Sequence, residues 1–269
     1  FHPHPATPDA QESRGLGDVY KRQEHPQEQI DQIQYHTNDR GLLPAASYAM
    51  AYQSKLAGKE RGVFSFCMCP GGFIVPSSTS PDEIVVNGMS PSRRDSKFAN
   101  SGIVVAIEEQ DLKDVHLMGP LAGMKFQARL EKRAWQSVSK GQMAPAQRLE
   151  DFMNGVHSSS LNASSYQPGL ESIEMRTILP KFINERLKQG FRFFDYKMRG
   201  YITNEAQIIG IESRTSSPVR IPRDKITCEH QEVKRLFPCG EGAGYAGGIV
   251  SAAMDGERCM DHLAKLYLK

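Results

Sequence analysis

The sequence has 269 residues, with 33 lysines and arginines against 31 aspartates and glutamates, and a formal net charge of +2. At about 150 residues per domain, this length predicts one or two domains with a buried core and excludes a peptide or a fibrous protein. The balanced charge gives no reason to expect nucleic acid as a partner. Aliphatic runs such as residues 103–107 fall far short of the ~18 residues of a membrane span, so no membrane partner is expected either.

The first 23 residues contain three prolines and few large apolar side chains, with neither a helical nor a strand period. We therefore expect residues 1–23 to be a disordered tail. Residues 13–23 (SRGLGDVYKRQ) look like a translated read-through scar and are left out of the fold prediction. His2 and His4 in such a tail make a poor metal cage, and no metal site is predicted. Five cysteines and no basic-then-apolar signal pattern favour a reducing, cytoplasmic location.

The remaining chain alternates between helical and strand patterns. A polar helical pattern runs over residues 27–57, interrupted near Gly41. Short strands follow at 62–67, 72–75 and 83–86, separated by proline and glycine turns that favour a small antiparallel sheet. A longer apolar strand, expected to be central, covers residues 101–108. Helical spacing predicts helices at 121–136, 145–154 and 179–194, the second with proline in its first turn. Strands are predicted at 204–213, 218–221 and 232–238, before a final helix that we expect to be packed along an apolar stripe.

A glycine cluster, LFPCGEGAGYAGGI at residues 236–249, is the sharpest motif. Gly242, Gly244 and Gly247 have the G-x-G-x-x-G spacing of a dinucleotide fingerprint. A Rossmann unit needs a second strand after the helix, whereas this sequence ends at Lys269, so we expect the cluster to close a domain whose strands lie upstream. Glycine backbone without side chains and the positive end of the helix dipole favour the binding of an anionic or polarised oxygen. The Glu241 carboxylate can accept hydrogen bonds from sugar or ribityl hydroxyls. The alternative is a turn that merely packs against a neighbouring backbone.

Several motifs occur in a specific order: FSFCMCPGG (64–72), VNGMS (86–90), ANS (99–101), GPLAG (119–123), ESRTSSPVR (212–220) and the glycine cluster. Together they resemble a bacterial FAD-dependent dehydrogenase family of the two-dinucleotide-fold type. The resemblance covers residues 24–269 and implies an α/β fold, the C-terminal part of a glutathione-reductase-like FAD-binding fold with a mixed α+β insert. Residues 24–200 would be the inserted substrate-side domain, and residues 201–269 would return to complete the FAD-binding domain.

The resemblance also implies site residues. Those facing FAD would be Gly240, Glu241, Gly242, Ala243, Gly244, Tyr245, Gly247, Gly248 and Ile249. A loop near the flavin or substrate, with Arg214 holding a carboxylate or phosphate, would consist of Arg214, Thr215, Ser216 and Ser217. The implied reaction is hydride or electron transfer through FAD, with NAD(P)H as a candidate electron donor. Because the N-terminal FAD fingerprint is absent, the chain alone is expected to be inactive. The alternative is a non-catalytic module that uses the same turn to bind an anion or another chain.

Cys67 and Cys69 are the remaining candidates for chemistry. Strand alternation would place both thiols on one face, where a redox or substrate role is conceivable. The alternative is a pair of buried, reduced thiols that only pack.

Overall fold

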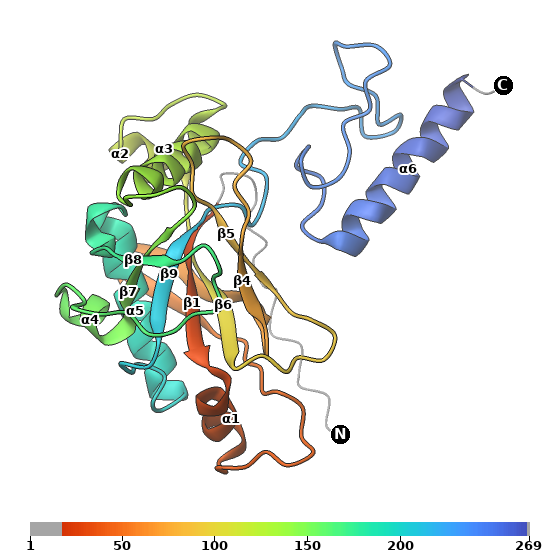
Figure 1. Ribbon diagram of the computed structural model, residues 1–269. Coiled ribbons are helices and arrows are strands. Elements are labelled where there is room, and N and C mark those ends of the chain that lie inside the picture. Colours follow the sequence, from red (N-terminus) through yellow and green to blue (C-terminus); the bar gives the residue numbers. More distant parts are fainter. Residues whose placement is uncertain (1–17, 268–269) are drawn as a thin grey trace. The chain divides into compact units, whose positions relative to one another are not determined.

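The computed structural model describes residues 18–267 (Figure 1). The chain folds into two units. Unit 2 comprises Val19–Ala106 and Gln127–Ser213. The described part of unit 1 comprises Asp18, Ile107–Phe126 and residues 214–267. Helices and a largely antiparallel sheet occur together, which confirms the predicted α/β class.

A seven-stranded sheet in the order β2-β3-β6-β1-β9-β7-β8 forms the centre of unit 2. Its strands are β1 (Asp18–Pro26), β2 (Ala51–Leu56), β3 (Lys59–Cys69), β6 (Phe98–Ala106), β7 (Ala144–Arg148), β8 (Leu170–Ser172) and β9 (Gln207–Glu212). The pairs β2–β3, β3–β6, β1–β9 and β7–β9 are antiparallel, and β7–β8 is parallel. Strands β4 (Phe73–Pro76) and β5 (Val86–Met89) form a separate antiparallel pair, in line with the small sheet expected there.

Burial explains why the central strands do not alternate between apolar and polar residues. All six residues of β9 are buried, as are seven consecutive residues of β6, because both faces of the sheet are covered. Helix α5 (Lys181–Lys197) packs on β2, β3 and β6. The other helices with residues in unit 2 are α1 (Gln27–Tyr35), α3 (Ala122–Gln136), α4 (Leu149–Asn154) and the single 3-10 turn η1 (Met175–Thr177).

Strand β1 corrects the prediction of a tail over residues 1–23. The structure places residues 18–23 in the sheet between β6 and β9, with Lys21, Arg22 and Gln23 fully buried. These polar side chains give no apolar alternation, so the sequence pattern could not reveal the strand. The remainder of the predicted tail, including His2 and His4, lies outside the described residues.

Three further predictions within unit 2 were wrong in type or position. The helix predicted over residues 27–57 ends at Tyr35, and residues 51–56 form β2, paired with β3. Residues 145–148, predicted as a helix start because of Pro145, belong to β7, and only α4 is helical. The strand predicted at 83–86 begins at Val86. Since β9 lies in the sheet, the unit boundary falls after Ser213, not after residue 200 as expected.

Unit 1 contains α2 (Glu109–Asp114) and α6 (Ile249–Tyr267), and residues 214–248 form neither helix nor strand. The strands predicted at 218–221 and 232–238 were therefore wrong. The final helix was predicted correctly, but its expected packing was not: only Cys259 of α6 is buried, whereas Ile249 is 91% exposed. Among the helices of residues 18–267, none is long and apolar enough to cross a membrane.

Candidate functional site

The glycine turn, residues 240–248, leads directly into α6. Gly240 and Gly244 have positive φ angles of 70° and 81°. The Gly244 and Tyr245 amides donate to the carbonyls of Glu241 and Gly240 at 2.9 and 3.0 Å, closing a tight loop. A Cβ at Gly244 would lie 2.8 Å from the Val219 carbonyl oxygen, so this position requires glycine for close backbone packing as well as for its φ.

An arginine–aspartate pair attaches this turn to α6. Arg223 donates to both carboxylate oxygens of Asp255, at 2.6 and 2.9 Å, and Asp255 also accepts from the Gly240 amide at 2.9 Å. The hydrogen bonds from Arg223 lower the pKa of Asp255. The Arg223 guanidinium lies 3.6 Å from the centroid of the Tyr245 ring, a cation–π contact. One ion pair thus fixes the glycine turn, an aromatic ring and the helix relative to one another.

The predicted loop 214–217 meets the glycine turn. Ser217 donates to the carbonyl of Gly242 at 3.1 Å, so the structure brings these two sequence motifs together within unit 1. Ser216 has a buried hydroxyl oxygen with no hydrogen-bond partner in the described chain. Thr215 is buried and Arg214 is exposed.

Open backbone is the chemically distinctive feature of the turn. A Cβ at Gly242 would meet no atom within 4 Å. Within the described part of the chain, the amides of Gly247, Gly248 and Ile249 donate no hydrogen bond, and the Glu241 carboxylate has no partner. Free amides at a helix start bind anionic oxygens, and a free carboxylate accepts from hydroxyl groups. A phosphate- and hydroxyl-bearing nucleotide such as FAD fits this donor and acceptor set, and the orphaned Ser216 hydroxyl adds another polar group.

The two predicted cysteines lie in unit 2, but in different environments. The pairing of β3 with β6 shifts register between Phe66 and Cys69, and Cys67 within this bulge has a φ of 44°. The bulge breaks strand alternation, so Cys67 is exposed while Cys69 is buried. Burial raises the pKa of the Cys69 thiol, which disfavours its reactive thiolate. The prediction that both thiols share one face was therefore wrong.

A buried charge pair lies close to Cys69. Arg22 and Glu212 approach to 3.2 Å between Nη1 and Oε2, and Arg22 also donates to the Cys67 carbonyl at 3.2 Å. Burial raises the pKa of Glu212 to about 7, against the opposing effect of Arg22. Sequence reasoning missed Arg22 because it lay in the excluded segment. The structure also accounts for the glycine of the VNGMS motif, because a Cβ at Gly88 would collide with the Arg22 guanidinium.

Comparison with known proteins shows to which family the chain belongs. The family model described as "FAD-dependent protein, C-terminal domain-like" matches residues 18–215. The chain belongs to this family. An uncharacterised protein of Clostridium beijerinckii is 42% identical over 249 residues, covering 91% of this chain and 46% of the relative. The chain thus spans about half the length of the curated relative that it matches.

Membership in the FAD-dependent protein C-terminal domain-like family confirms the predicted link to flavoproteins at a coarse level. The match begins where β1 begins and ends just beyond β9, so it covers unit 2, the Ile107–Phe126 segment of unit 1 and the start of the 214–217 loop. The glycine turn lies outside the matched residues. A role for the glycine turn in binding is therefore supported by its own geometry and sequence, and not by the family match.

Proposed function

We propose that this chain is the C-terminal part of an FAD-dependent oxidoreductase and that its glycine turn contacts the flavin nucleotide. The observation that supports this most directly is the open backbone at Gly242 beside the unpartnered Glu241 carboxylate, among the residues described. FAD, when bound, supplies hydride or electron transfer. In this proposal unit 2 is the substrate-side domain, and the chain without the rest of a longer protein is inactive.

The residues of unit 1 have separate tasks in the proposal. Amides of Gly247, Gly248 and Ile249, together with the positive end of the α6 dipole, stabilise negative charge. Glu241 accepts from ribityl hydroxyl groups. Asp255 and Arg223 hold the turn in place and do not contact the nucleotide.

The test uses two glycines that the structure makes comparable. A Cβ at either Gly242 or Gly256 meets no atom within 4 Å, so Gly242→Ala and Gly256→Ala should both leave the fold intact. Only the first would place a methyl group where the nucleotide approaches. The variants are made in this chain joined to the region of the Clostridium beijerinckii relative that lies outside the match. After mixing with FAD and gel filtration, the flavin absorbance per protein is measured.

We expect the parent and Gly256→Ala to retain flavin and Gly242→Ala to lose at least tenfold in FAD affinity. Flavin retained equally by all three would show that the turn does not contact FAD. A joined protein that stays colourless would contradict an FAD function and favour the alternative, a non-catalytic module that binds anions through this turn. Inorganic phosphate would then protect the α6 amides from hydrogen exchange. Oxidation of NAD(P)H by the flavin-loaded protein tests the nicotinamide donor.

A further inference from the structure

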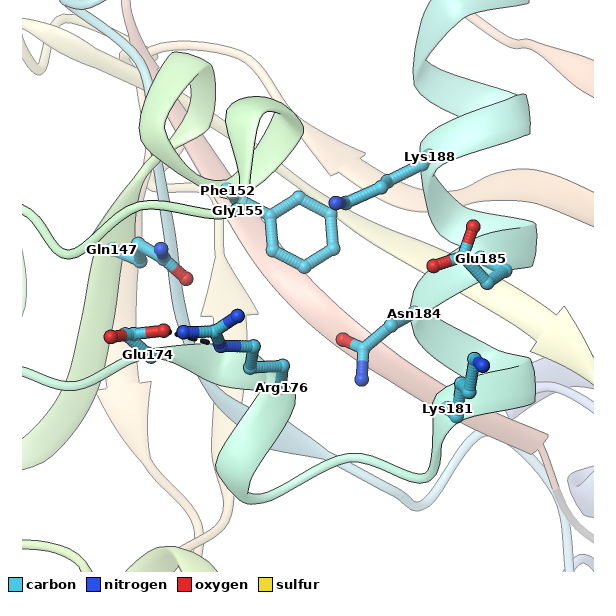
Figure 2. A pocket seen from close by; sticks show the side chains of 9 residues that line it. All are labelled: Gln147, Phe152, Gly155, Glu174, Arg176, Lys181, Asn184, Glu185 and Lys188. Atoms are coloured by element: carbon cyan, nitrogen blue, oxygen red, sulfur yellow. Dashed lines mark ion pairs between the residues drawn. The ribbon is translucent and has the colours of Figure 1, made fainter.

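A pocket of about 330 Å³ opens in unit 2 between α4, η1 and the first half of α5 (Figure 2). This volume is at the lower end of the range for small-molecule sites, so it suits a small metabolite and not a dinucleotide. The pocket belongs to neither the glycine turn nor the Arg22–Glu212 pair.

Asn184 forms the back of this pocket. Its side chain is 4% exposed, and its Nδ2 donates to the carbonyls of Leu179 and Pro180 at 3.0 and 3.2 Å. These two bonds fix the amide so that Oδ1 can only accept. Oδ1 is buried, accepts no hydrogen bond within residues 18–267, and is directed into the cavity in Figure 2. An acceptor left unsatisfied in this way costs about 1–3 kcal/mol, which a ligand with an N–H or O–H donor would recover.

Three cationic side chains line the same pocket, those of Arg176, Lys181 and Lys188. Lys188 lies with Nζ 5.7 Å from the centroid of the Phe152 ring and has no carboxylate partner in the described chain. Arg176 pairs with Glu174 only through Nε, at 2.5 Å, so both terminal nitrogens of its guanidinium are available. A forked guanidinium and an ammonium together suit a carboxylate group.

Two carboxylates line the pocket, and that of Glu174 is already paired with Arg176. Glu185 neighbours Asn184 on α5, lines the pocket, and makes no ion pair or hydrogen bond with any described residue. A neutral hydroxyl donor would satisfy Asn184 but leave Glu185 unpaired, whereas an ammonium group can satisfy both. Arg176 thus borders the pocket from η1, whereas Lys188, Asn184 and Glu185 border it from α5, where the carboxylate lies beside the neutral acceptor.

We propose that this pocket binds a small amino acid as its zwitterion. Arg176 and Lys188 hold the ligand carboxylate, and Asn184 Oδ1 with Glu185 holds its ammonium group. This assignment uses unit 2 alone and is independent of the proposed flavin function.

The structure supplies a matched control for the test. Lys197, also on α5, lies with Nζ 5.7 Å from the centroid of the Phe193 ring, but it does not line this pocket. Lys188→Met and Lys197→Met thus remove the same charge from the same kind of contact. Pools of L-amino acids, and then their single members, are titrated into the 269-residue chain by calorimetry. Lactate and ethylamine serve as probes that carry only one of the two charged groups.

We expect at least one amino acid to bind, and Lys188→Met to weaken that binding about tenfold or more while Lys197→Met leaves it unchanged. Glu185→Gln should reduce the affinity for the amino acid more than it reduces the affinity for lactate. The proposal is overturned if no amino acid binds, if the two lysine variants weaken binding equally, or if lactate or ethylamine binds as tightly as the amino acid. Circular dichroism verifies that each variant is folded.

Discussion

The two units of the chain are stabilised in different ways. In unit 2, every residue of β9 is buried, whereas in unit 1 only Cys259 of the 19-residue α6 is. Burial of apolar surface dominates folding energies, so unit 2 has the means to be stable by itself. Unit 1 is organised by Arg223, Asp255 and the glycine turn, and leaves apolar side chains of α6 such as Ile249 and Val250 exposed. Substitutions that perturb only one unit should sharpen this difference.

The largest effect is expected at Lys21, an unfavourable residue within the core of unit 2. Its side chain is fully buried, and its ammonium contacts only the Met175 sulfur, at 2.6 Å, within the described chain. Burial lowers the pKa of Lys21 to about 7, from 10.5. The unfolded chain therefore binds more protons than the native one between pH 7 and 10.5, and stability rises with pH over this range. Lys21→Met should stabilise unit 2 by roughly 4 kcal/mol at pH 7.

The gain from Lys21→Met should shrink toward zero near pH 10.5, since the unfolded lysine then also becomes neutral. Urea unfolding measures the free energy of unfolding at each pH. It is followed by the fluorescence of Trp135, which is the single tryptophan and belongs to unit 2. Lys55→Met is the control, because Lys55 is 69% exposed in β2. A gain that does not vary with pH, or an equal gain from the control, would mean that Lys21 is not buried as a neutral amine.

A smaller effect is expected where α5 crosses β3. A Cβ at Gly190 would collide with Cγ1 of the fully buried Val63. Alanine normally favours a helix over glycine by about 1 kcal/mol, but here overpacking should win, and Gly190→Ala should destabilise unit 2 by about 2 kcal/mol.

Combining Gly190→Ala with Val63→Ala removes the contacting methyl groups and tests this cause. The double variant should be less destabilised than the sum of the two single variants, by at least 1 kcal/mol in urea unfolding. Additive effects would contradict the close helix–sheet approach.

Parts of unit 2 followed from sequence because their side chains obey simple periods. Helices α3 and α5 and strand β6 lie close to where apolar spacing predicted them. Strand β1 was missed because Lys21 and Arg22 are polar and nevertheless buried. Residues 145–148 were misassigned because Pro145 suits the first turn of a helix, whereas in the structure Pro145 pairs with β8 and the residues that follow it pair with β9. At these positions the pairing with strands that are distant in the sequence overrides the local conformational preference.

The candidate sites divide in the same way. Spacing alone pointed to the glycine turn, since its residues are contiguous and their backbone requirement is local. The pocket around Asn184 left no such trace: Arg176 and Lys188 are ordinary surface-type residues until η1 and α5 bring them together. Nothing in the sequence indicates that the Asn184 amide nitrogen is occupied and its oxygen free.

The smallest effect is expected in unit 1, at Asp255. Replacing its carboxylate by an amide in Asp255→Asn weakens the paired hydrogen bonds from Arg223 and should cost about 1 kcal/mol locally. Amides of α6 should then exchange their hydrogens about fivefold faster, while those of β6 and β9 keep their rates, because the sheet does not depend on this ion pair. Asp261→Asn, the same change at an exposed position of α6, should leave exchange unaltered. Equal acceleration in β9 and α6 would contradict separate stabilisation, since both units would then open in one cooperative step.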